Sequence, residues 1–317
     1  MLRYIAKRLL LILPALFGVA VLTFVSLRVL PGDVVAVRMY AETGSAPPAL
    51  VAQERKRLGL DQPLPMQFAS WMGGLITFDL GQSMWTGRPV REEIGIRIGL
   101  SLQVALMATL IAVLVAIPLG TLSAIFRNSP LDYFVRIVTI AGLAVPSFWL
   151  GMLIVMVLLL GFRWSPPVTY TPFFVDPLAN FSQLIWPALS VGYRYAAVVA
   201  RMVRSSVIEV MREDYIRTAR AKGVFERMVI SRHALRNALL PAITVIGLEF
   251  AFLIGGLVVT EQVFNLNGIG RLFVEAVTRL DYTLIQALVM LTAVLFALAN
   301  LTVDIIYGLL DPRLRHK

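Results

Sequence analysis

The chain has 317 residues, of which 58% are hydrophobic and 15% charged, and its mean hydropathy is +0.78. These values exclude an ordinary soluble domain and indicate an integral membrane protein. A formal charge of +10 is typical of nucleic-acid binding or of Lys and Arg gathered in cytoplasmic loops. In so apolar a chain we expect the second and no nucleic-acid partner. The sequence has no cysteine, which excludes disulfides, thiolate metal sites and cysteine nucleophiles.

Six apolar segments approach the roughly 20 residues that a helix needs to cross a bilayer. They cover residues 9–30, 101–126, 135–161, 184–203, 239–263 and 284–308. The first follows a basic N-terminus, as a signal peptide does, but its apolar run is too long for a cleaved one, so we expect it to be retained. The fourth is the weakest because it contains Gly192 and Arg194, and its alternative is a re-entrant or interfacial helix. The sequence thus predicts an all-α polytopic membrane protein with six transmembrane helices.

These segments divide the chain into four parts. The parts are an N-terminal transmembrane helix (1–31), an extracytoplasmic loop region with short helices (32–100), a five-helix core (101–308) that includes a cytoplasmic loop (201–238), and a tail (309–317). An even number of spans returns the C-terminus to the side of the N-terminus. Most Lys and Arg residues fall on that side, so the positive-inside rule predicts that both termini are cytoplasmic.

The extracytoplasmic region has equal numbers of acidic and basic residues. We expect a chain break at 44–48, a short helix at 53–58 that Gly59 ends, and an aromatic segment at 71–80 resting at the membrane interface. The region is either a cap over the external mouth or a docking surface for an external partner. The sequence leaves both open.

Enzymatic chemistry lacks its usual residues. No lysine completes a glycine-rich phosphate loop, so ATP, if it drives this protein, is hydrolysed by another chain. The histidines, His233 and His316, both fall on the cytoplasmic side, and no H-E-x-x-H motif is present. Glu249 and Asp304 lie at different depths of their spans, which disfavours a shared-proton pair. We therefore expect no catalytic residues, no metal site and no cofactor in this chain.

Arg194 and Glu249 are ionisable residues placed inside apolar spans. Each costs roughly 3 kcal/mol or more to insert, so such residues mark a pathway or a buried pair. Both lie about halfway along their spans and hence at similar depth. We expect either a structural ion pair or residues that line an aqueous translocation cavity and contact a charged substrate.

The loop 201–238 contains a short segment with a pattern of its own. Its residues are Tyr215, Arg217, Thr218, Ala219, Arg220, Ala221, Lys222 and Gly223. Small residues flanked by basic ones, followed by a glycine, predict a short helix that enters a protein groove and pairs with acids around it. The alternative is a basic loop on anionic membrane lipid. That alternative explains the charge but not the small-residue face that Gly223 ends.

This segment, together with Arg232–Pro241, resembles the coupling-helix signature of permease subunits of ABC importers in the peptide/nickel subfamily. The general signature begins Glu-Ala-Ala, whereas Arg217-Thr218-Ala219 stands there in this chain, the form typical of the peptide subfamily. Gly223 is in register. The match extends along the chain in order: Met1–Ile5, Leu30–Asp33, Leu58–Pro63, Asp79–Gly81, Thr86–Pro89, Pro146–Gly151, Glu261–Gly270 and Asp304–Arg313.

The resemblance, to dipeptide/oligopeptide permease B in particular, implies a type I ABC importer permease fold in a bacterial inner membrane. It implies alternating-access transport of di- or oligopeptides or a related solute such as glutathione, a nickel chelate or a glycoside. It also implies a homologous second permease, two cytosolic subunits that bind ATP and Mg, and an extracytoplasmic substrate-binding protein. The alternatives are an ion-coupled secondary transporter that uses Glu249, and a membrane scaffold without a pathway.

Overall fold

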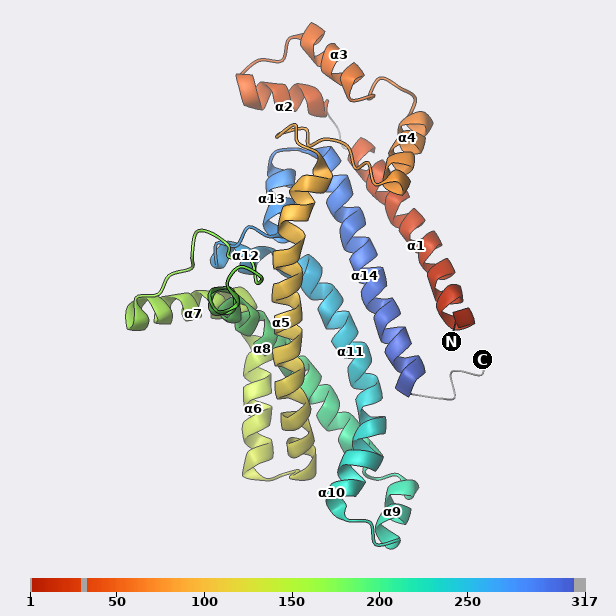
Figure 1. Ribbon diagram of the computed structural model, residues 1–317, viewed down its shortest axis with the longest axis vertical. Helices are drawn as coiled ribbons and strands as arrows, with labels where there is room; N and C mark the ends of the chain where they lie inside the picture. The colour runs from red at the N-terminus through yellow and green to blue at the C-terminus, as the bar shows by residue number, and fades with distance from the viewer. Residues whose placement is uncertain (1, 30–32, 311–317) are drawn as a thin grey trace.

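The computed structural model describes residues 2–29 and 33–310, and its regular elements there are all helical. Most of the expected tail lies outside these ranges. The long helices are α1 (Leu2–Val29), α5 (Val90–Ile125), α6 (Pro130–Ala144), α7 (Ser147–Phe162), α8 (Pro177–Val210), α11 (Leu235–Gly256) and α14 (Tyr282–Leu310). Figure 1 shows α5, α8, α11 and α14 as a bundle, with α1 beside α14 and α6 beside α5.

Four helices in the described ranges are long and apolar enough to cross a membrane. They are Arg8–Arg28, Val90–Ile125, Glu226–Gly256 and Tyr282–Gly308, and the pair α6 and α7 makes a fifth if it counts as one span. The prediction of an all-helical polytopic membrane protein is confirmed at this level. Helix α8 contains the expected fourth span and has 34 residues, but it is too polar to join this group.

The expected third span, 135–161, is not one straight helix. Helices α6 and α7 meet at an angle of 101°, and α7 projects sideways from the bundle (Figure 1). The chain turns at Val145, which adopts an extended conformation with φ −86° and ψ 123°. Because Val145 precedes Pro146, the proline ring disfavours the helical conformation there, and Pro146 itself has no N–H to continue the helix.

The expected fifth span, 239–263, is interrupted near its end. Helix α11 stops at Gly256, and the short helix α12 (Val258–Val263) follows after Leu257. Consecutive glycines, Gly255 and Gly256, weaken a helix because they lose the most backbone freedom on folding. Helix α13 (Ile269–Thr278) then leads into α14.

Small residues let α8 lie close to α5 along much of their length. Buried Ala108, Ala112 and Ala116 recur every fourth residue on α5. On α8, a Cβ added to Gly192 would come within 3.1 Å of the Ala108 carbonyl oxygen. On α5, a Cβ added to Gly120 would lie 2.7 Å from the Ala200 carbonyl oxygen. Such close approach is typical of membrane helix packing. In lipid, helices associate through van der Waals contact, and small residues let their backbones come close enough to make it.

The region expected to be extracytoplasmic forms three short helices at one end of the bundle (Figure 1): α2 (Val34–Thr43), α3 (Pro48–Arg57) and α4 (Leu64–Thr77). The sequence predicted α3 only in part and missed α2. The sequence contained a signal for the start of α2, because aspartate is a preferred residue just before a helix. In the structure, the Asp33 carboxylate accepts hydrogen bonds from the first-turn amides of α2 at 3.0 and 3.3 Å. Gly44 ends α2 with a φ of 72°, as the expected break indicated.

Aromatic rings join this region to the first span. Phe68 of α4 packs edge-on against Phe17 and Phe24 of α1, with ring centres 6.1 and 5.2 Å apart. Trp71 stacks on Phe24 at 6.0 Å. Trp71 of the expected aromatic segment therefore packs against a helix of the same chain, whereas Phe78 is 79% exposed.

Helices α11 and α14 approach most closely at Gly247, where an added Cβ would lie 1.9 Å from a methyl group of Val303. We expect Gly247→Ala to destabilise the protein by about 1–3 kcal/mol through overpacking, although alanine favours a helix by about 1 kcal/mol. Thermal unfolding of the purified protein measures this. Val303→Ala in the same chain restores the melting temperature in part. Gly255→Ala is the control on the same helix, because its nearest neighbour is at 3.6 Å. A Gly247→Ala protein as stable as this control contradicts the packing.

Candidate functional site

The segment with the coupling-helix pattern forms helix α9 (Asp214–Ala221), as predicted. It lies between the end of α8 and a short connection to α11, made of α10 (Glu226–Met228) and the π-helix η1 (Val229–Ala234). Figure 1 shows it at the end of the molecule opposite α2 and α3. The π-helix runs directly into α11, so α9 is joined by short links to two long helices.

One face of α9 is buried against the connection that follows it. Ile216 is fully buried and Ala219 is 8% exposed, and both pack with Val229 and Ala234 of η1. The expected small-residue face is therefore divided: Ala219 points inward, whereas Thr218 and Ala221 are exposed. The outward residues of the segment are Tyr215, Arg217, Thr218, Arg220, Ala221 and Lys222.

Polar contacts hold α9 in this orientation. The Asn237 amide donates to the Tyr215 hydroxyl at 2.8 Å. The Arg220 guanidinium donates two hydrogen bonds to the Glu226 carboxylate, at 3.0 and 2.6 Å. These bonds raise the pKa of Arg220 above its ordinary value. Because this ion pair is exposed, it contributes little stability and mainly orients the two side chains.

Gly223 ends the helix as the sequence predicted. Its φ is +76°, in the left-handed region that glycine adopts without a steric penalty. No heavy atom lies within 4 Å of an added Cβ, so the backbone angle and not lack of space requires glycine here. Its amide donates to the Arg220 carbonyl oxygen at 2.9 Å and turns the chain back towards α10.

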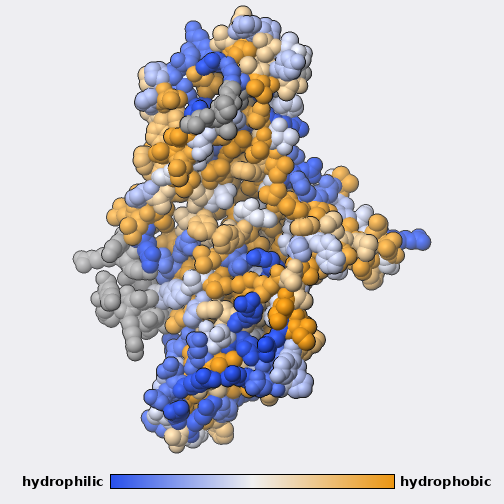
Figure 2. Space-filling model, turned by 180° about the vertical axis from the view of Figure 1, so that it is seen from behind, coloured by the Kyte–Doolittle hydropathy of each residue, from blue (hydrophilic) through white to orange (hydrophobic). Residues whose placement is uncertain are grey.

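The exposed face of α9 is strongly basic. Figure 2 shows hydrophilic side chains gathered at this end of the molecule. Arg217 lies 3.3 Å from Asp214, but both side chains are largely exposed, at 74% and 94%. Water screens such a pair, so the positive charge of the face remains available to an acidic surface.

The structure brings Arg194 and Glu249 together, from α8 and α11 respectively. Their nearest atoms, Nη1 and Oε2, are 3.4 Å apart, and no second bond supports the contact. The Glu249 side chain is 15% exposed, whereas that of Arg194 is 50% exposed. The arginine therefore reaches the glutamate while much of its guanidinium faces out of the described chain.

The sequence reasoning missed a buried ion pair beyond α5. Asp132 is fully buried and accepts two hydrogen bonds from Arg204, each of 2.8 Å, one from Ser123 at 2.6 Å and one from the Asn128 amide at 2.9 Å. This network joins α5, α6 and α8. A signal was present, because Ser129 and Asp132 have the spacing of a helix N-terminus. Arg204 had been interpreted only as a positive charge on the cytoplasmic side.

A second buried acid was also missed. Glu261 is fully buried and accepts hydrogen bonds from the Ser101 hydroxyl at 2.6 Å and from the Arg271 amide at 2.9 Å. It joins α5, α12 and α13, and it lies in the Glu261–Gly270 motif quoted above. Across residues 2–29 and 33–310, no three His, Asp or Glu side chains are grouped as a metal site needs. Asp132 and Glu261 each join helices that are separate in the sequence.

Comparison with known proteins identifies the family. The family model of the binding-protein-dependent transport system inner membrane component matches residues 116–316, and its N-terminal counterpart matches residues 1–105. The glutathione transport system permease protein GsiC is 40% identical in Pectobacterium atrosepticum, 41% in Salmonella typhimurium and 40% in Escherichia coli K12. Each match covers 317 residues and 100% of both chains. The chain therefore belongs to the family of inner membrane components of binding-protein-dependent transport systems and is a permease subunit of an ABC importer.

Proposed function

We propose that this chain forms half of the translocation pathway of an ATP-driven importer for glutathione or another short peptide. The observation that carries the proposal is the full-length similarity to glutathione transport system permeases, at 40–41% identity. Glutathione is itself a peptide, so the cargo class agrees with the peptide subfamily that the motifs resemble. Among the alternatives, nickel chelates and glycosides have no support from these relatives.

The proposed complex contains a second, homologous permease, two cytosolic ATPases with their ATP and Mg, and an extracytoplasmic binding protein. The family is defined by dependence on a binding protein, which supports that partner. The lack of a phosphate loop supports separate ATPases. The helices α2, α3 and α4, which cover one end of the bundle, are the proposed contact for the binding protein.

We place six spans in the membrane by adding α8 and the bent pair α6 and α7 to the four apolar helices. Helix α8 is polar for a span, but it is surrounded by α5, α6, α7 and α11. Its polar residues Asn180, Gln183 and Ser190 are buried among these helices. Burial of these three residues keeps their polar groups away from lipid where the helix crosses a bilayer. Both termini and α9 then lie in the cytoplasm.

The absence of native cysteine permits a direct test of this topology. We expect Ser45→Cys, next to α2, to react with a membrane-impermeant maleimide in spheroplasts. Ala221→Cys in α9 should react only after the membrane is opened, as should a cysteine tag fused after Lys317. Ser45 and Ala221 are exposed in the structure, so buried thiols do not account for a negative result at either position. Labelling of Ala221→Cys in sealed spheroplasts contradicts the orientation.

Helix α9 is the proposed contact for an ATPase. Its inner face is fixed by Ile216 and Ala219, and its outer face presents small and basic side chains. Because α9 is joined to α8 on one side and through η1 to α11 on the other, a push on α9 acts on both helices. These two helices carry Arg194 and Glu249. A nucleotide-driven movement of the ATPases thereby changes the relative position of the pair, provided that each partner binds one arrangement more tightly.

This contact predicts that Ala221→Glu uncouples ATP hydrolysis from uptake. The larger, acidic side chain disturbs a face suited to small and basic groups, while the buried packing of Ala219 is untouched. We expect uptake in proteoliposomes to fall by about tenfold or more, equivalent to about 1.4 kcal/mol, with the chain still inserted and ATP still hydrolysed. Ala221→Ser is the control that should transport normally, because it keeps a small side chain at the same position. Normal uptake by Ala221→Glu excludes α9 as the contact.

Arg194 and Glu249 are the proposed polar groups of the pathway. A pair held only for stability is expected to have a buried carboxylate that accepts two hydrogen bonds, as Asp132 does from Arg204. The single 3.4 Å contact and the half-exposed Arg194 fit instead a cation that also meets an anionic substrate. Glutathione carries carboxylates that an arginine binds well.

We therefore expect Arg194→Gln to lower uptake of glutathione by about tenfold, with the complex still assembled in size-exclusion chromatography. Arg163→Gln is a control for the loss of an arginine. Loss of assembly on Arg194→Gln supports the structural pair and contradicts the pathway role.

An ionophore that collapses ion gradients, added with ATP present, tests the remaining alternative, an ion-coupled transporter. Uptake should persist under the ionophore, whereas an ion-coupled transporter that uses Glu249 loses it.

A further inference from the structure

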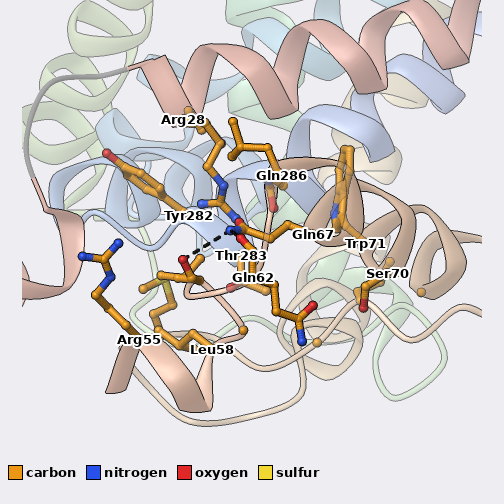
Figure 3. Close-up of a pocket in the computed structure, with 18 of the residues that line it drawn as sticks. Arg28, Arg55, Leu58, Gln62, Gln67, Ser70, Trp71, Tyr282, Thr283 and Gln286 are labelled. Carbon is orange, nitrogen blue, oxygen red and sulfur yellow. Dashed lines mark hydrogen bonds between the residues drawn. The ribbon is translucent and has the colours of Figure 1, made fainter. Parts of the chain in front are cut away.

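A cavity of about 690 Å³ lies at the external end of α1, and neither Arg194 nor Glu249 lines it. Its walls come from the end of α1, the turn between α3 and α4, α4 itself and the start of α14. Figure 3 shows Arg28, Gln67 and Gln286 together at its centre, with Tyr282 on one side and Trp71 on the other. The proposed import function does not use this cavity.

The cavity contains hydrogen-bonding atoms that the described chain leaves without partners. Nε of Arg28 and Nε2 of Gln286 are buried donors, and Oε1 of Gln67 is a buried acceptor. Gln286 is only 6% exposed. Buried polar atoms are nearly always satisfied in native proteins, because each unsatisfied one costs about 1–3 kcal/mol. All three residues line one cavity, and a ligand that accepts from two of these atoms and donates to the third would satisfy them.

The charges around the cavity specify the ligand further. Asp33 is engaged by Arg55 at 3.3 Å and by the amides that begin α2. The Asp79 carboxylate accepts from the Gly81 amide at 3.1 Å. Among the described residues, Arg28 has no carboxylate within ion-pair distance, and its one ring contact is with Phe24 at 5.2 Å. A half-buried guanidinium beside an amide donor favours an oxyanion, to which both donate charge-assisted hydrogen bonds.

Apolar side chains form part of the remaining wall, including Leu27, Leu64, Trp71 and Met84. They accommodate the carbon atoms next to an oxyanion. Arg28 ends an apolar helix, and Trp71 lies beside it, a combination that is common where a protein meets the head groups of a membrane. Gln67 is suited to accept from a hydroxyl or ammonium group near the oxyanion.

We propose that this cavity is a binding site for a phosphate or carboxylate group, held by Arg28 and Gln286, with Gln67 accepting from a neighbouring ligand hydroxyl or ammonium. The source is either the head group of an anionic phospholipid or a free anion in the external fluid. Because the walls belong to α1, the α3–α4 region and α14, a bound anion fastens the first span and the external helices to the last span. Binding therefore also stabilises the folded protein by mass action.

The test uses the whole importer complex in nanodiscs. In the lipid arm, discs of phosphatidylcholine with and without phosphatidylglycerol are compared by native mass spectrometry, which counts anionic lipids retained by the complex. In the free-anion arm, inorganic phosphate is titrated into phosphatidylcholine discs while the melting temperature is followed. The variants are Arg28→Gln and Gln286→Leu. The matched controls are Arg91→Gln and Gln53→Leu, which remove exposed side chains of the same types from the external region.

We expect one arm to show saturable binding that both cavity variants weaken by about tenfold or more and that both controls preserve. Gln286→Leu keeps the argument testable if Arg28→Gln fails to fold, because leucine replaces a buried amide without opening a cavity. Retention of phosphatidylglycerol identifies the lipid source, and a phosphate-dependent rise in melting temperature identifies the free anion. Binding in neither arm, or an equal loss in cavity and control variants, overturns the proposal.

Discussion

The structure depends on the shelter of one polar helix. Helix α8 carries buried asparagine, glutamine and serine side chains in a segment that has to cross a membrane in the proposed topology, and polar groups are costly in lipid. The small residues of α5 and α8, with Gly192 against Ala108 and Gly120 against Ala200, allow the two backbones to approach closely. Helices α6, α7 and α11 complete the enclosure. The position of every other functional group in the bundle follows from this central packing.

The strengths of the polar contacts differ along the bundle. Asp132 accepts two short hydrogen bonds from Arg204, and Glu261 is bound by a hydroxyl and a backbone amide. Both acids are fully buried. Breaking such contacts leaves an uncompensated buried charge and is strongly unfavourable. The Arg194–Glu249 contact is single, longer and partly exposed. In the proposed mechanism, α8 and α11 therefore separate at this pair while the buried acids keep the neighbouring helices together.

Helix α9 suits this mechanism because it is both rigid and closely linked. Its apolar inner face and its contacts with Asn237 and Glu226 hold it against the start of α11. A force on its outer face is transmitted to the bundle rather than lost in a flexible loop. The anion site proposed at the other end would have the opposite effect, since it fastens α1 and the external helices to α14. In these two proposals, energy from ATP hydrolysis enters at α9, while a bound anion holds the helices at the other end in place.

Local patterns in the sequence determined much of this protein. Hydropathy determined the all-helical membrane class, and the small and basic residues before Gly223 located α9 correctly, because a helix of eight residues ended by glycine depends on neighbours along the chain. The sequence could not show that Pro146 turns a span through 101°, whereas Pro118, Pro187 and Pro241 remain inside helices. That outcome depends on whether the surrounding helices support the backbone. Nor could it show that Ala219 points inward, that Arg204 pairs with Asp132, or that Arg28 and Gln286 meet. These residues are distant in sequence, and only the packing of separate helices decides which of them come together.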